Sequence, residues 1–465
     1  MNVMHHQCEF KDKKITVMGL GLFGGGVGVS RFLASQGARV TVTDLKGATE
    51  LAPSIKQLEG LPISFKLGGH CESDFANADM IIINPAVPRN SKFIQIAQNH
   101  GVPLNTEMNL FFQLCPAPII GITGSNGKST TTTLTARILE QTRRKTWMGG
   151  NIGKSLLNSL DEIKPDGIVV VELSSFQLAE LRNIKKSPHI SVLTNLSPNH
   201  LDRHGDMDDY IYAKKGIIAH QTLADYTILN YDDPELRRWE RERKGRVLWY
   251  SARQPVREGV FIKGNSMVIA IDGVSTDVPG LSEVKLPGVH NLQNIFAASC
   301  AAYLAGARRP HIEKEIMAFT GLEHRLEFVR EVAGVQYFND SKATTPESAI
   351  AAISAFQSPV ILIAGGSDKG SSFEAFADAC VKHTRSVILI GKTAQKIKGL
   401  IQGKKDTRET PAISTPETFK DAFMQAHQTA QAGEVVLLSP ACASYDMFTN
   451  YEDRGRQFKE MSLAL

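Results

Sequence analysis

Short apolar runs alternate with longer amphipathic segments along this chain, and most of the runs end in a glycine-rich or polar loop. This alternation predicts β-strands followed by α-helices, which is the pattern of α/β domains with parallel sheets. In the first part of the chain we expect strands over residues 14–19, 38–44 and 80–84 and a helix over residues 29–36.

The same alternation continues to the end of the chain. We expect further strands over residues 118–122, 168–173, 191–196, 336–339, 360–364, 386–390 and 434–439, and helices over 130–141 and 291–305. Residues 247–287 alternate apolar and polar side chains between glycine turns, which predicts a small antiparallel insertion. Because 465 residues are too many for one core, we expect three domains, over residues 1–106, 107–321 and 322–465.

Composition narrows the class of protein. A hydrophobic content of 42% and a charged content of 22% are those of an ordinary globular protein, and the dispersed net charge of +4 argues against nucleic-acid binding. Residues 1–14 lack the apolar core of a signal peptide, and no run approaches a membrane span of about 20 apolar residues. The cysteines are far apart and contain no Cys-x-x-Cys pair, so we expect reduced thiols and a cytoplasmic location.

Residues 118–130 (PIIGITGSNGKST) carry the strongest chemical signal. An apolar strand, a glycine-rich turn and a helix follow one another, so backbone N–H groups of the turn can point at phosphate oxygens. Lys128 would reach the β- and γ-phosphates of a nucleotide, and the Ser129 hydroxyl would hold Mg²⁺. The spacing departs slightly from the common P-loop, because Ile122 stands where the first glycine is usual.

A second glycine loop near the N-terminus has the G-x-G-x-x-G spacing, at Gly19, Gly21 and Gly24. A strand precedes it, a helix follows it, and Asp44 comes twenty residues after Gly24, as in dinucleotide-binding folds. The loop allows a backbone to approach a diphosphate, so either NAD(P) or another nucleotide diphosphate such as UDP could use it.

Acidic and histidine side chains follow two of the central strands. Glu172 ends a buried-looking strand and suits Mg²⁺ together with Ser129, although it could instead cap the helix that begins at residues 174–175. His200, Asp202 and His204 alternate after the next strand. Taken alone they could bind zinc, but nucleotide chemistry favours Mg²⁺ and oxygen ligands.

These motifs together resemble the Mur ligases, the ATP-dependent amide-bond-forming enzymes of cytoplasmic peptidoglycan assembly. The resemblance covers nearly all of the chain, and it is carried by residues 123–129 (TGSNGKS), 172–177 (ELSSFQ), 199–204 (NHLDRH) with Lys214, 288–294 (GVHNLQN), 324–325 (HR) and 339–342 (NDSK). Residues 339–344, 439–448 (SPACASYDMF) and 451–456 (YEDRGR) are similar to the member that adds glutamate. The Asp-Asn-Pro-Arg run that marks the member adding a diamino acid is absent.

The resemblance implies a fold and a reaction. It implies a Rossmann-like N-terminal domain that binds a UDP substrate, a central P-loop domain and a Rossmann-like C-terminal domain that binds the amino acid. The carboxylate of UDP-N-acetylmuramoyl-L-alanine would attack the γ-phosphate of ATP, and the amine of glutamate would then displace phosphate from the acyl phosphate. We expect two Mg²⁺ ions, a monomer and only small-molecule partners; which enantiomer of glutamate reacts stays open.

The resemblance also implies roles for individual residues. The implied ATP-binding residues are Gly124, Asn126, Gly127, Lys128, Ser129, Thr130, Asn294, Arg325 and Asp340. The implied UDP-substrate residues are Leu22, Phe23, Asp44, Lys46, Asn151, Ser175 and His200, and the implied glutamate residues are Lys342, Thr344, Lys369, Ser444 and Tyr451. The catalytic set is Lys128, Glu172, His200 and Lys214, and the metal set is Ser129, Glu172, His200 and Lys214 if the lysine is carbamylated.

Several alternatives stay open at this point. Lys214 could be an exposed lysine, and its neighbour Lys215 could take its place. His204 is expected to be structural, and Tyr451 stands where the family usually has phenylalanine. The chain could be another Mur-type amino-acid ligase or an inactive nucleotide-binding scaffold. A nicotinamide-dependent dehydrogenase is the alternative from a different class, although it leaves Lys128 without a role.

Overall fold

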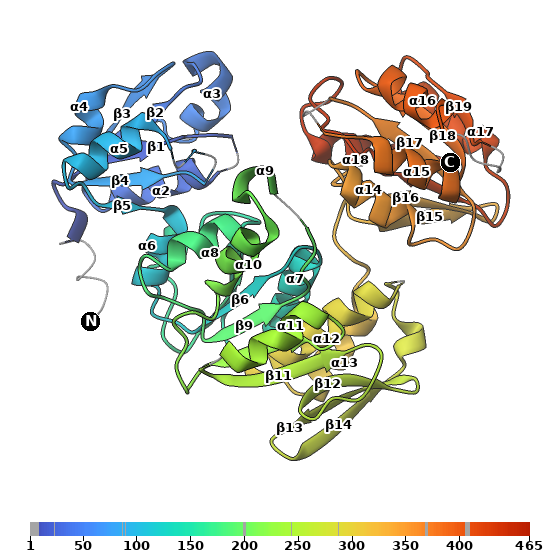
Figure 1. Ribbon diagram of the computed structural model, residues 1–465, viewed down its shortest axis with the longest axis horizontal. Helices are drawn as coiled ribbons and strands as arrows, with labels where there is room; N and C mark the ends of the chain where they lie inside the picture. Colours follow the sequence, from blue (N-terminus) through green and yellow to red (C-terminus); the bar gives the residue numbers. More distant parts are fainter. Residues whose placement is uncertain are drawn as a thin grey trace. The chain divides into compact units, whose positions relative to one another are not determined.

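A computed structural model describes residues 9–22, 24–85, 87–88, 90–198, 201–242, 244–286, 288–367, 371–404 and 410–465. Three separate β-sheets, of five, nine and six strands, form the frame of the molecule (Figure 1). The chain divides into two compact units. The first contains the chain up to Val284 and Val289–Ala318, and the second contains Lys285–Gly288 and Phe319–Leu465.

The N-terminal sheet is parallel throughout, in the order β3-β2-β1-β4-β5. Its elements are β1 (Lys14–Met18), α2 (Gly25–Ser35), β2 (Arg39–Asp44), α3 (Ala48–Lys56), β3 (Ile63–Leu67), α4 (Glu72–Ala76), β4 (Met80–Ile83), α5 (Lys92–Asn99) and β5 (Leu104–Asn105). The three expected strands are confirmed within a residue. The helix begins at Gly25, four residues earlier than expected. Its first turn contains glycines because the helix packs closely on the preceding loop: a Cβ on Gly26 would lie 2.3 Å from Leu20 O.

The central sheet has the order β14-β13-β12-β11-β10-β9-β6-β8-β7. Its first elements are α6 (Glu107–Leu114), β6 (Ile119–Thr123), α7 (Lys128–Glu140), β7 (Thr146–Gly150), η1 (Leu156–Ser159), β8 (Ile168–Glu172), α8 (Ser175–Leu181), β9 (Ile190–Leu193), α9 (Leu201–His204) and α10 (Met207–Lys215). The remainder are β10 (Tyr226–Asn230), α11 (Pro234–Arg238), η2 (Trp239–Glu242), β11 (Arg246–Ser251), β12 (Gly259–Lys263), β13 (Ser266–Ile271), β14 (Val274–Pro279), η3 (Leu281–Glu283), α12 (Val289–Leu304) and α13 (Arg309–Ala318).

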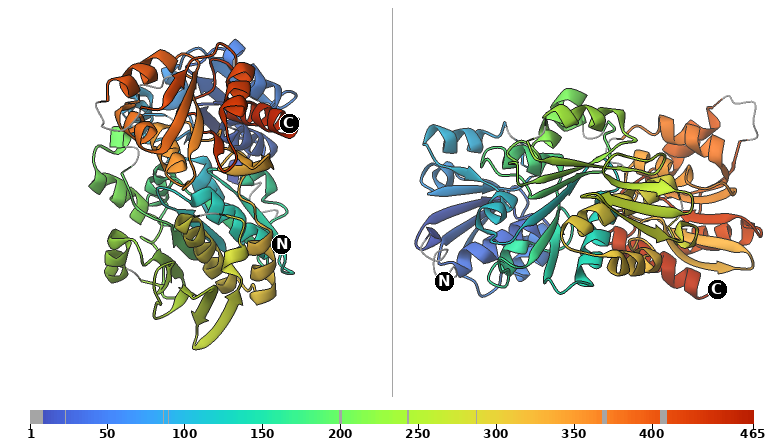
Figure 2. Two further views of the ribbon diagram at one scale, coloured as in Figure 1. Left: turned by 90° about the vertical axis from the view of Figure 1, so that its right-hand side faces the viewer. Right: turned by 90° about the horizontal axis from the view of Figure 1, so that it is seen from below.

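Strands β6, β8 and β9 are buried along their whole lengths, as parallel strands covered on both faces must be. The small antiparallel insertion expected over residues 247–287 is present as strands β12–β14. They continue the central sheet, because β11 pairs with both β10 and β12, and they form its outer end (yellow-green in Figures 1 and 2). The strand expected over 191–196 ends earlier, at Leu193.

The C-terminal sheet has the order β15-β16-β20-β17-β18-β19, with β15 antiparallel to its neighbour and the other strands parallel. Its elements are β15 (Glu327–Val332), β16 (Val335–Asn339), α14 (Pro346–Ile353), β17 (Val360–Gly365), α15 (Glu374–His383), β18 (Thr384–Ile390), α16 (Ala394–Gln402), β19 (Ala412–Ser414), α17 (Phe419–Thr429), β20 (Val435–Leu438) and α18 (Tyr451–Leu463). The four strands expected here are confirmed within two residues.

The N-terminal and central sheets share one hydrophobic core within the first unit. Helix α2 packs on η1 so closely that a Cβ on Gly28 would lie 2.2 Å from Ser155 Cβ. The second unit has its own cores on the two faces of its sheet. None of the helices in the described ranges is long and apolar enough to cross a membrane.

Candidate active site

The P-loop lies between β6 and α7, and residues after a neighbouring strand hold it in shape. Gly124 (φ 151°) and Gly127 (φ 81°) take left-handed conformations that favour glycine, and Gly127 is the N-cap of α7. Asn195 Oδ1 accepts from Asn126 N at 2.9 Å, and Thr194 Oγ1 donates to Asn126 O. Sequence reasoning missed these two residues. They could have been found because they follow β9 at the carboxyl edge of the sheet, where α/β proteins bind ligands.

The Lys128 ammonium lies over this loop. Its Nζ donates to Gly124 O at 2.9 Å and to Ser125 O at 2.8 Å. The oxygens of a bound triphosphate would be charged acceptors for the same donor and would form stronger bonds. Ser129 and Thr130 follow in the first turn of α7 and are buried. Residues 124–130 therefore form a glycine-containing loop at a helix N-terminus, which is the arrangement that binds phosphate in α/β proteins.

Helix α12 brings Asn294 to the same loop. Thr131 Oγ1 donates to Asn294 Oδ1 at 3.4 Å, and Asn294 is buried. A Cβ on Gly127 would lie 2.2 Å from Asn294 Oδ1, so only glycine permits this approach. The structure thus places the predicted adenosine residue beside the predicted phosphate loop.

Glu172 ends β8 directly beside the strand that leads into the P-loop, in register with Ile122. Its Oε1 accepts from Asn151 Nδ2 at 2.9 Å, whereas its buried Oε2 has no hydrogen-bond partner within the described residues. A buried carboxylate oxygen without a donor, on the strand beside the one that leads into the P-loop, fits a hard cation such as Mg²⁺. The alternative role as a helix cap is wrong, because Ser174 caps α8.

Lys214 is almost completely buried, which contradicts the alternative of an exposed lysine. Its Nζ donates to Thr123 Oγ1 at 3.1 Å and lies 4.9 Å from the centre of the Tyr210 ring. Burial, and secondarily the charge of Lys128, lower the pKa of the Lys214 ammonium well below its ordinary value, while Glu172 opposes the shift. Lys215 instead pairs with Glu242 at 2.6 Å, so the two lysines are not interchangeable.

A series of contacts leads from Lys214 through the rings of Tyr210, His204 and Phe176 towards the N-terminal part of the first unit. His204 Nε2 and Ser175 Oγ are 2.8 Å apart, and the His204 ring stacks on Phe176 with centres 4.9 Å apart. The Arg203 guanidinium lies 4.3 Å from the centre of the Phe176 ring and donates to Pro85 O at 3.1 Å. His204 therefore orients Ser175, in line with the structural role expected for it.

A cavity of about 740 Å³ lies within the first unit and is lined by residues of the P-loop, of α8 and α10, and of the N-terminal sheet. Among the described residues, five predicted site residues line it: Gly124, Lys128, Asn151, Ser175 and Lys214. Gly25 and Gly26, at the N-terminus of α2, and Asn84 line its other part. The cavity therefore runs from the P-loop to the first glycine loop. Asn84, Gln177, Arg203 and Tyr210 are lining residues that sequence reasoning did not assign.

Asp44 is used by the first glycine loop itself. Its Oδ2 accepts from Leu20 N at 2.9 Å and Gly21 N at 3.1 Å, and its Oδ1 accepts from Lys46 N at 3.0 Å. The carboxylate therefore shapes the loop, and its contact with a ligand stays a prediction. Leu22, in the same loop, is exposed.

In the second unit, the loop after β16 carries Asp340, Lys342 and Thr344. Asp340 is buried; its Oδ1 accepts from Leu326 N at 3.1 Å and its Oδ2 accepts from Ser439 Oγ at 2.7 Å. Burial raises the pKa of Asp340 to about 7, which the hydrogen bond from Ser439 only partly offsets.

Arg454, which sequence reasoning left without a role, joins this loop to the loop after β20. Its fully buried guanidinium donates to Ser341 Oγ at 3.0 Å, to Ser341 O at 2.9 Å and to Cys442 O at 3.2 Å. Ser444 follows in the second loop and is buried, and Tyr451 begins α18. The structure thus places the predicted glutamate residues Lys342, Thr344 and Ser444 on the loops that follow β16 and β20, and Tyr451 at the start of α18.

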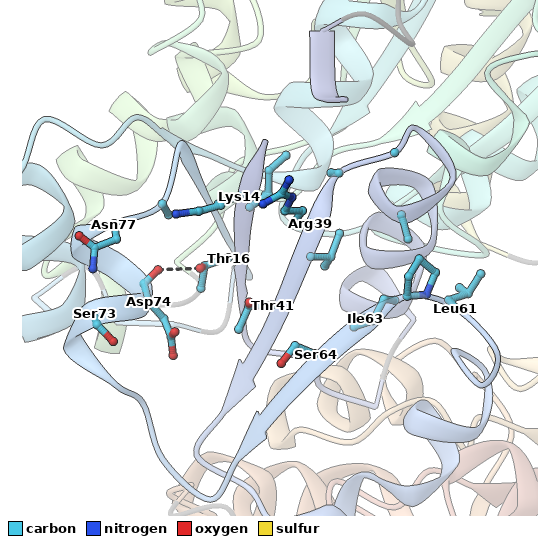
Figure 3. Close-up of a pocket in the computed structure, with 17 residues that line it drawn as sticks. Lys14, Thr16, Arg39, Thr41, Leu61, Ile63, Ser64, Ser73, Asp74 and Asn77 are labelled. Atoms are coloured by element: carbon cyan, nitrogen blue, oxygen red, sulfur yellow. Dashed lines mark hydrogen bonds between the residues drawn. The ribbon is translucent and has the colours of Figure 1, made fainter. Parts of the chain in front are cut away.

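Three predicted site residues, Phe23, His200 and Lys369, lie outside the described residues. A second cavity, of about 780 Å³, lies at the amino ends of β1–β3, where Lys14 and Arg39 stand and Thr16 Oγ1 donates to Asp74 O (Figure 3). The described residues that line it include none of the predicted site residues. Ligands of α/β sheets bind at the opposite, carboxyl edge, so we assign the chemistry to the first cavity.

Comparison with known proteins agrees with this geometry. The sequence matches three family models: Mur ligase MurD-like, N-terminal domain (residues 13–105), Mur ligase middle domain (122–302) and Mur ligase, glutamate ligase domain (324–442). The chain belongs to the Mur ligase family. Mur ligases are ATP- and Mg²⁺-dependent amino-acid ligases of peptidoglycan synthesis, so the dehydrogenase alternative is wrong.

Individual relatives are similar over their whole lengths. The chain is 40% identical over 455 residues to a UDP-N-acetylmuramoylalanine--D-glutamate ligase of Symbiobacterium thermophilum, covering 97% of this chain and 98% of the relative. It is 42% identical over 466 residues to the protein of the same name from Roseiflexus sp., covering 97% and 99%.

Solved structures share the fold at lower identity. The UDP-N-acetylmuramate-alanine ligase MurC of Thermotoga maritima has a TM-score of 0.59 at 18% identity, with 97% of this chain and 99% of that chain covered. A pseudomurein peptide ligase type C from Methanothermus fervidus has a TM-score of 0.56 at 19% identity, with coverage of 97% and 100%. These likenesses support the three-domain α/β architecture.

Proposed function

We propose that this protein joins D-glutamate to the L-alanine carboxylate of UDP-N-acetylmuramoyl-L-alanine and converts ATP to ADP and phosphate. The observation that carries the proposal is the cavity that runs from Lys128 and Lys214 to the glycine loop of the N-terminal sheet. A substrate with a nucleotide diphosphate at one end and a carboxylate at the other fits that arrangement. The names of the similar full-length proteins support the choice of D-glutamate.

In the first step the substrate carboxylate attacks the γ-phosphorus, a C–O–P bond forms, and the bond to the β-phosphate oxygen breaks to release ADP. Two anions must approach each other, so positioning and charge neutralisation supply most of the catalysis. Lys128 would exchange its bonds to the loop carbonyls for bonds to the phosphates. Arg325 would screen phosphate charge together with Lys128, and Asn294 and Asp340 would hold the adenosine part.

In the second step the amine of glutamate attacks the acyl carbon, a C–N bond forms, and phosphate leaves as the amine loses a proton. Lys342 and Lys369 would face the carboxylates of the amino acid, and Thr344, Ser444 and Tyr451 would complete its pocket. Ammonium groups facing a dicarboxylate match its charge.

Ser129, Glu172 and His200 would hold Mg²⁺, which when bound neutralises the phosphate oxygens. A second ion would require one more anionic ligand. We propose that Lys214 supplies it as a carbamate, formed when its amine adds to CO₂ and releases one proton. Only the neutral amine is a nucleophile, and the lowered pKa of Lys214 increases the neutral fraction.

Phosphate release tests the proposed reaction. With ATP and Mg²⁺, we expect phosphate only when UDP-N-acetylmuramoyl-L-alanine and D-glutamate are both present. L-Glutamate in place of D-glutamate is the matched control. Phosphate release that ignores the amino acid would refute the ligase, and equal rates with both enantiomers would refute the stereochemistry.

The carbamate has a separate test. Lys214→Ala should lose most activity and regain part of it with added short carboxylic acids, which can replace the missing ligand. Lys215→Ala, in which the ion pair with Glu242 is lost, should stay active. An active Lys214→Ala variant without added acid would show that the carbamate is not needed.

A further inference from the structure

One face of α18 contacts the turn that carries Arg325. The face consists of Tyr451, Gly455 and Lys459, which follow one another at intervals of four residues and so lie on the same side of the helix. The turn comprises residues 322–326, just before β15, which begins at Glu327. Both belong to the second compact unit.

The His324 ring is the centre of this contact. It is buried, and a Cβ on Gly455 would lie 2.3 Å from its Nδ1 and 2.9 Å from its Cε1 and Cγ. The ring therefore rests on the helix backbone at a depth that only glycine permits. The Tyr451 ring meets it edge-on, with centres 6.2 Å apart, and Asn339 Nδ2 donates to Nδ1 at 2.9 Å.

The next helical turn anchors the ends of the loop by charge. The Lys459 ammonium contacts Glu323 Oε1 at 2.8 Å and Glu327 Oε1 at 2.6 Å. Glu327 Oε2 in turn accepts from His324 N at 2.9 Å. The Lys459 ammonium bridges both carboxylates of this cluster, so the cluster reads as an anchor for the turn and not as a metal site.

Backbone bonds link His324 directly to two residues that are predicted to contact substrates. Arg325 is the next residue in the chain, and its N donates to Leu322 O at 3.1 Å. His324 O accepts from Lys342 N at 3.0 Å. A shift of the His324 ring therefore moves the backbone of both Arg325 and Lys342.

We propose that Gly455 is a positioning residue: by setting the depth of the His324 ring it places Arg325 for the nucleotide and Lys342 for the amino acid. One helix, α18, then adjusts both contacts together and also supplies Tyr451. The inference rests on the roles proposed above for Arg325 and Lys342, but the contact itself can be tested without them.

Gly455→Ala in the full-length protein is the test. Gly455 has an ordinary helical φ, so alanine meets no backbone strain, and any loss comes from the contact with the ring. We expect kcat/KM for ATP and for D-glutamate to fall about 10- to 100-fold, as a misplacement of about 1 Å can cause. The dissociation constant of UDP-N-acetylmuramoyl-L-alanine should not change, because the cavity described for it belongs to the first unit.

Gly399→Ala is the matched control, because Gly399 is an exposed glycine in α16 whose Cβ would meet no described atom within 4 Å. It should keep full activity. His324→Asn retains an acceptor for Asn339 and removes the ring volume. In that background Gly455→Ala should cause no further loss of activity and no further fall in melting temperature.

The outcomes separate the two proposals. If Gly455→Ala lowers activity and melting temperature equally in the wild-type and His324→Asn backgrounds, the proposal is overturned. An unchanged kcat/KM in the single Gly455→Ala variant would overturn it as well. If the wild-type protein has no ligase activity, the proposed function is refuted and the positioning role is overturned. Even then, a fall in the melting temperature of Gly455→Ala that disappears in the His324→Asn background would confirm the contact between Gly455 and the His324 ring.

Discussion

Gly127→Ala is the substitution that tests the phosphate loop most directly. Gly127 ends the loop in a left-handed conformation, with φ 81°, and caps α7. Its α-carbon also faces Asn294, whose Oδ1 would lie 2.2 Å from an added Cβ. The substitution therefore imposes two separate penalties, one on the backbone and one on the approach of α12.

The two penalties have different sizes and different targets. An L-residue in the left-handed region costs about 1–2 kcal/mol in stability. The contact at 2.2 Å is far inside an ordinary carbon–oxygen distance, so the Asn294 carboxamide must move. Because Asn294 is the predicted adenosine contact, we expect ATP affinity to fall at least tenfold, which corresponds to about 1.4 kcal/mol.

Gly60→Ala separates these effects. Gly60 lies in the same unit and also has φ 81°, but its Cβ would enter a space with no described atom within 4 Å. It should lose about 1–2 kcal/mol in urea unfolding and keep its ATP affinity. Asn294→Ala, measured beside it, removes the predicted adenosine contact, together with the hydrogen bond from Thr131, and leaves the loop glycine unchanged.

The assay combines urea unfolding with titration of a fluorescent ATP analogue. Gly127→Ala should lose about as much free energy of unfolding through backbone strain as Gly60→Ala does. Its ATP affinity should resemble that of Asn294→Ala. If Gly127→Ala binds ATP as tightly as Gly60→Ala does, then Asn294 does not contact the nucleotide through this loop, and the reasoning is refuted.

Three further predictions concern stability. Because the pKa of Asp340 is raised to about 7 from 3.8, its stabilising contribution is complete below about pH 4 and is lost as the pH rises through 7; Asp340→Asn should flatten urea stability measured between pH 5 and 8, and an unchanged slope would contradict this. Arg454→Lys keeps the charge but not the planar donors that reach Ser341 and Cys442, so it should cost about 1–3 kcal/mol in urea unfolding; a neutral variant would show that these bonds contribute little. Gly28→Ala pushes a methyl group into Ser155 and should lower the free energy of unfolding by about 1–3 kcal/mol; a variant as stable as wild type would show that α2 can move away from η1 without cost.

Local chemistry made much of the protein predictable from its sequence. Residues 123–130 carry their loop, their lysine and their helix start within eight positions, so the phosphate cradle needed no knowledge of the rest of the chain. Most of the expected strands also agree with the structure within two residues, because buried parallel strands are short apolar runs bounded by polar loops.

Predictions failed where packing overrides local preference. The glycines of α2 disfavour a helix in isolation, and the expected helix therefore began too late. In the folded chain Gly26 and Gly28 are needed for the helix to approach Leu20 and Ser155. The antiparallel strands expected over residues 247–287 are present as β12–β14, but only the structure shows that they continue the central sheet, because β12 pairs with β11.

The amino-acid sequence alone determined the α/β class, the phosphate loop and the family resemblance, since each depends on residues that are close together along the chain. Only the tertiary structure buried Lys214 while pairing Lys215 with Glu242, left one oxygen of Glu172 without a donor, and gave Arg454 its place between two loops. These properties depend on which distant segments meet: Lys214 reaches Thr123 across 91 positions and Arg454 reaches Ser341 across 113. Burial and hydrogen bonding between such segments arise from packing, and spacing along the chain does not encode them.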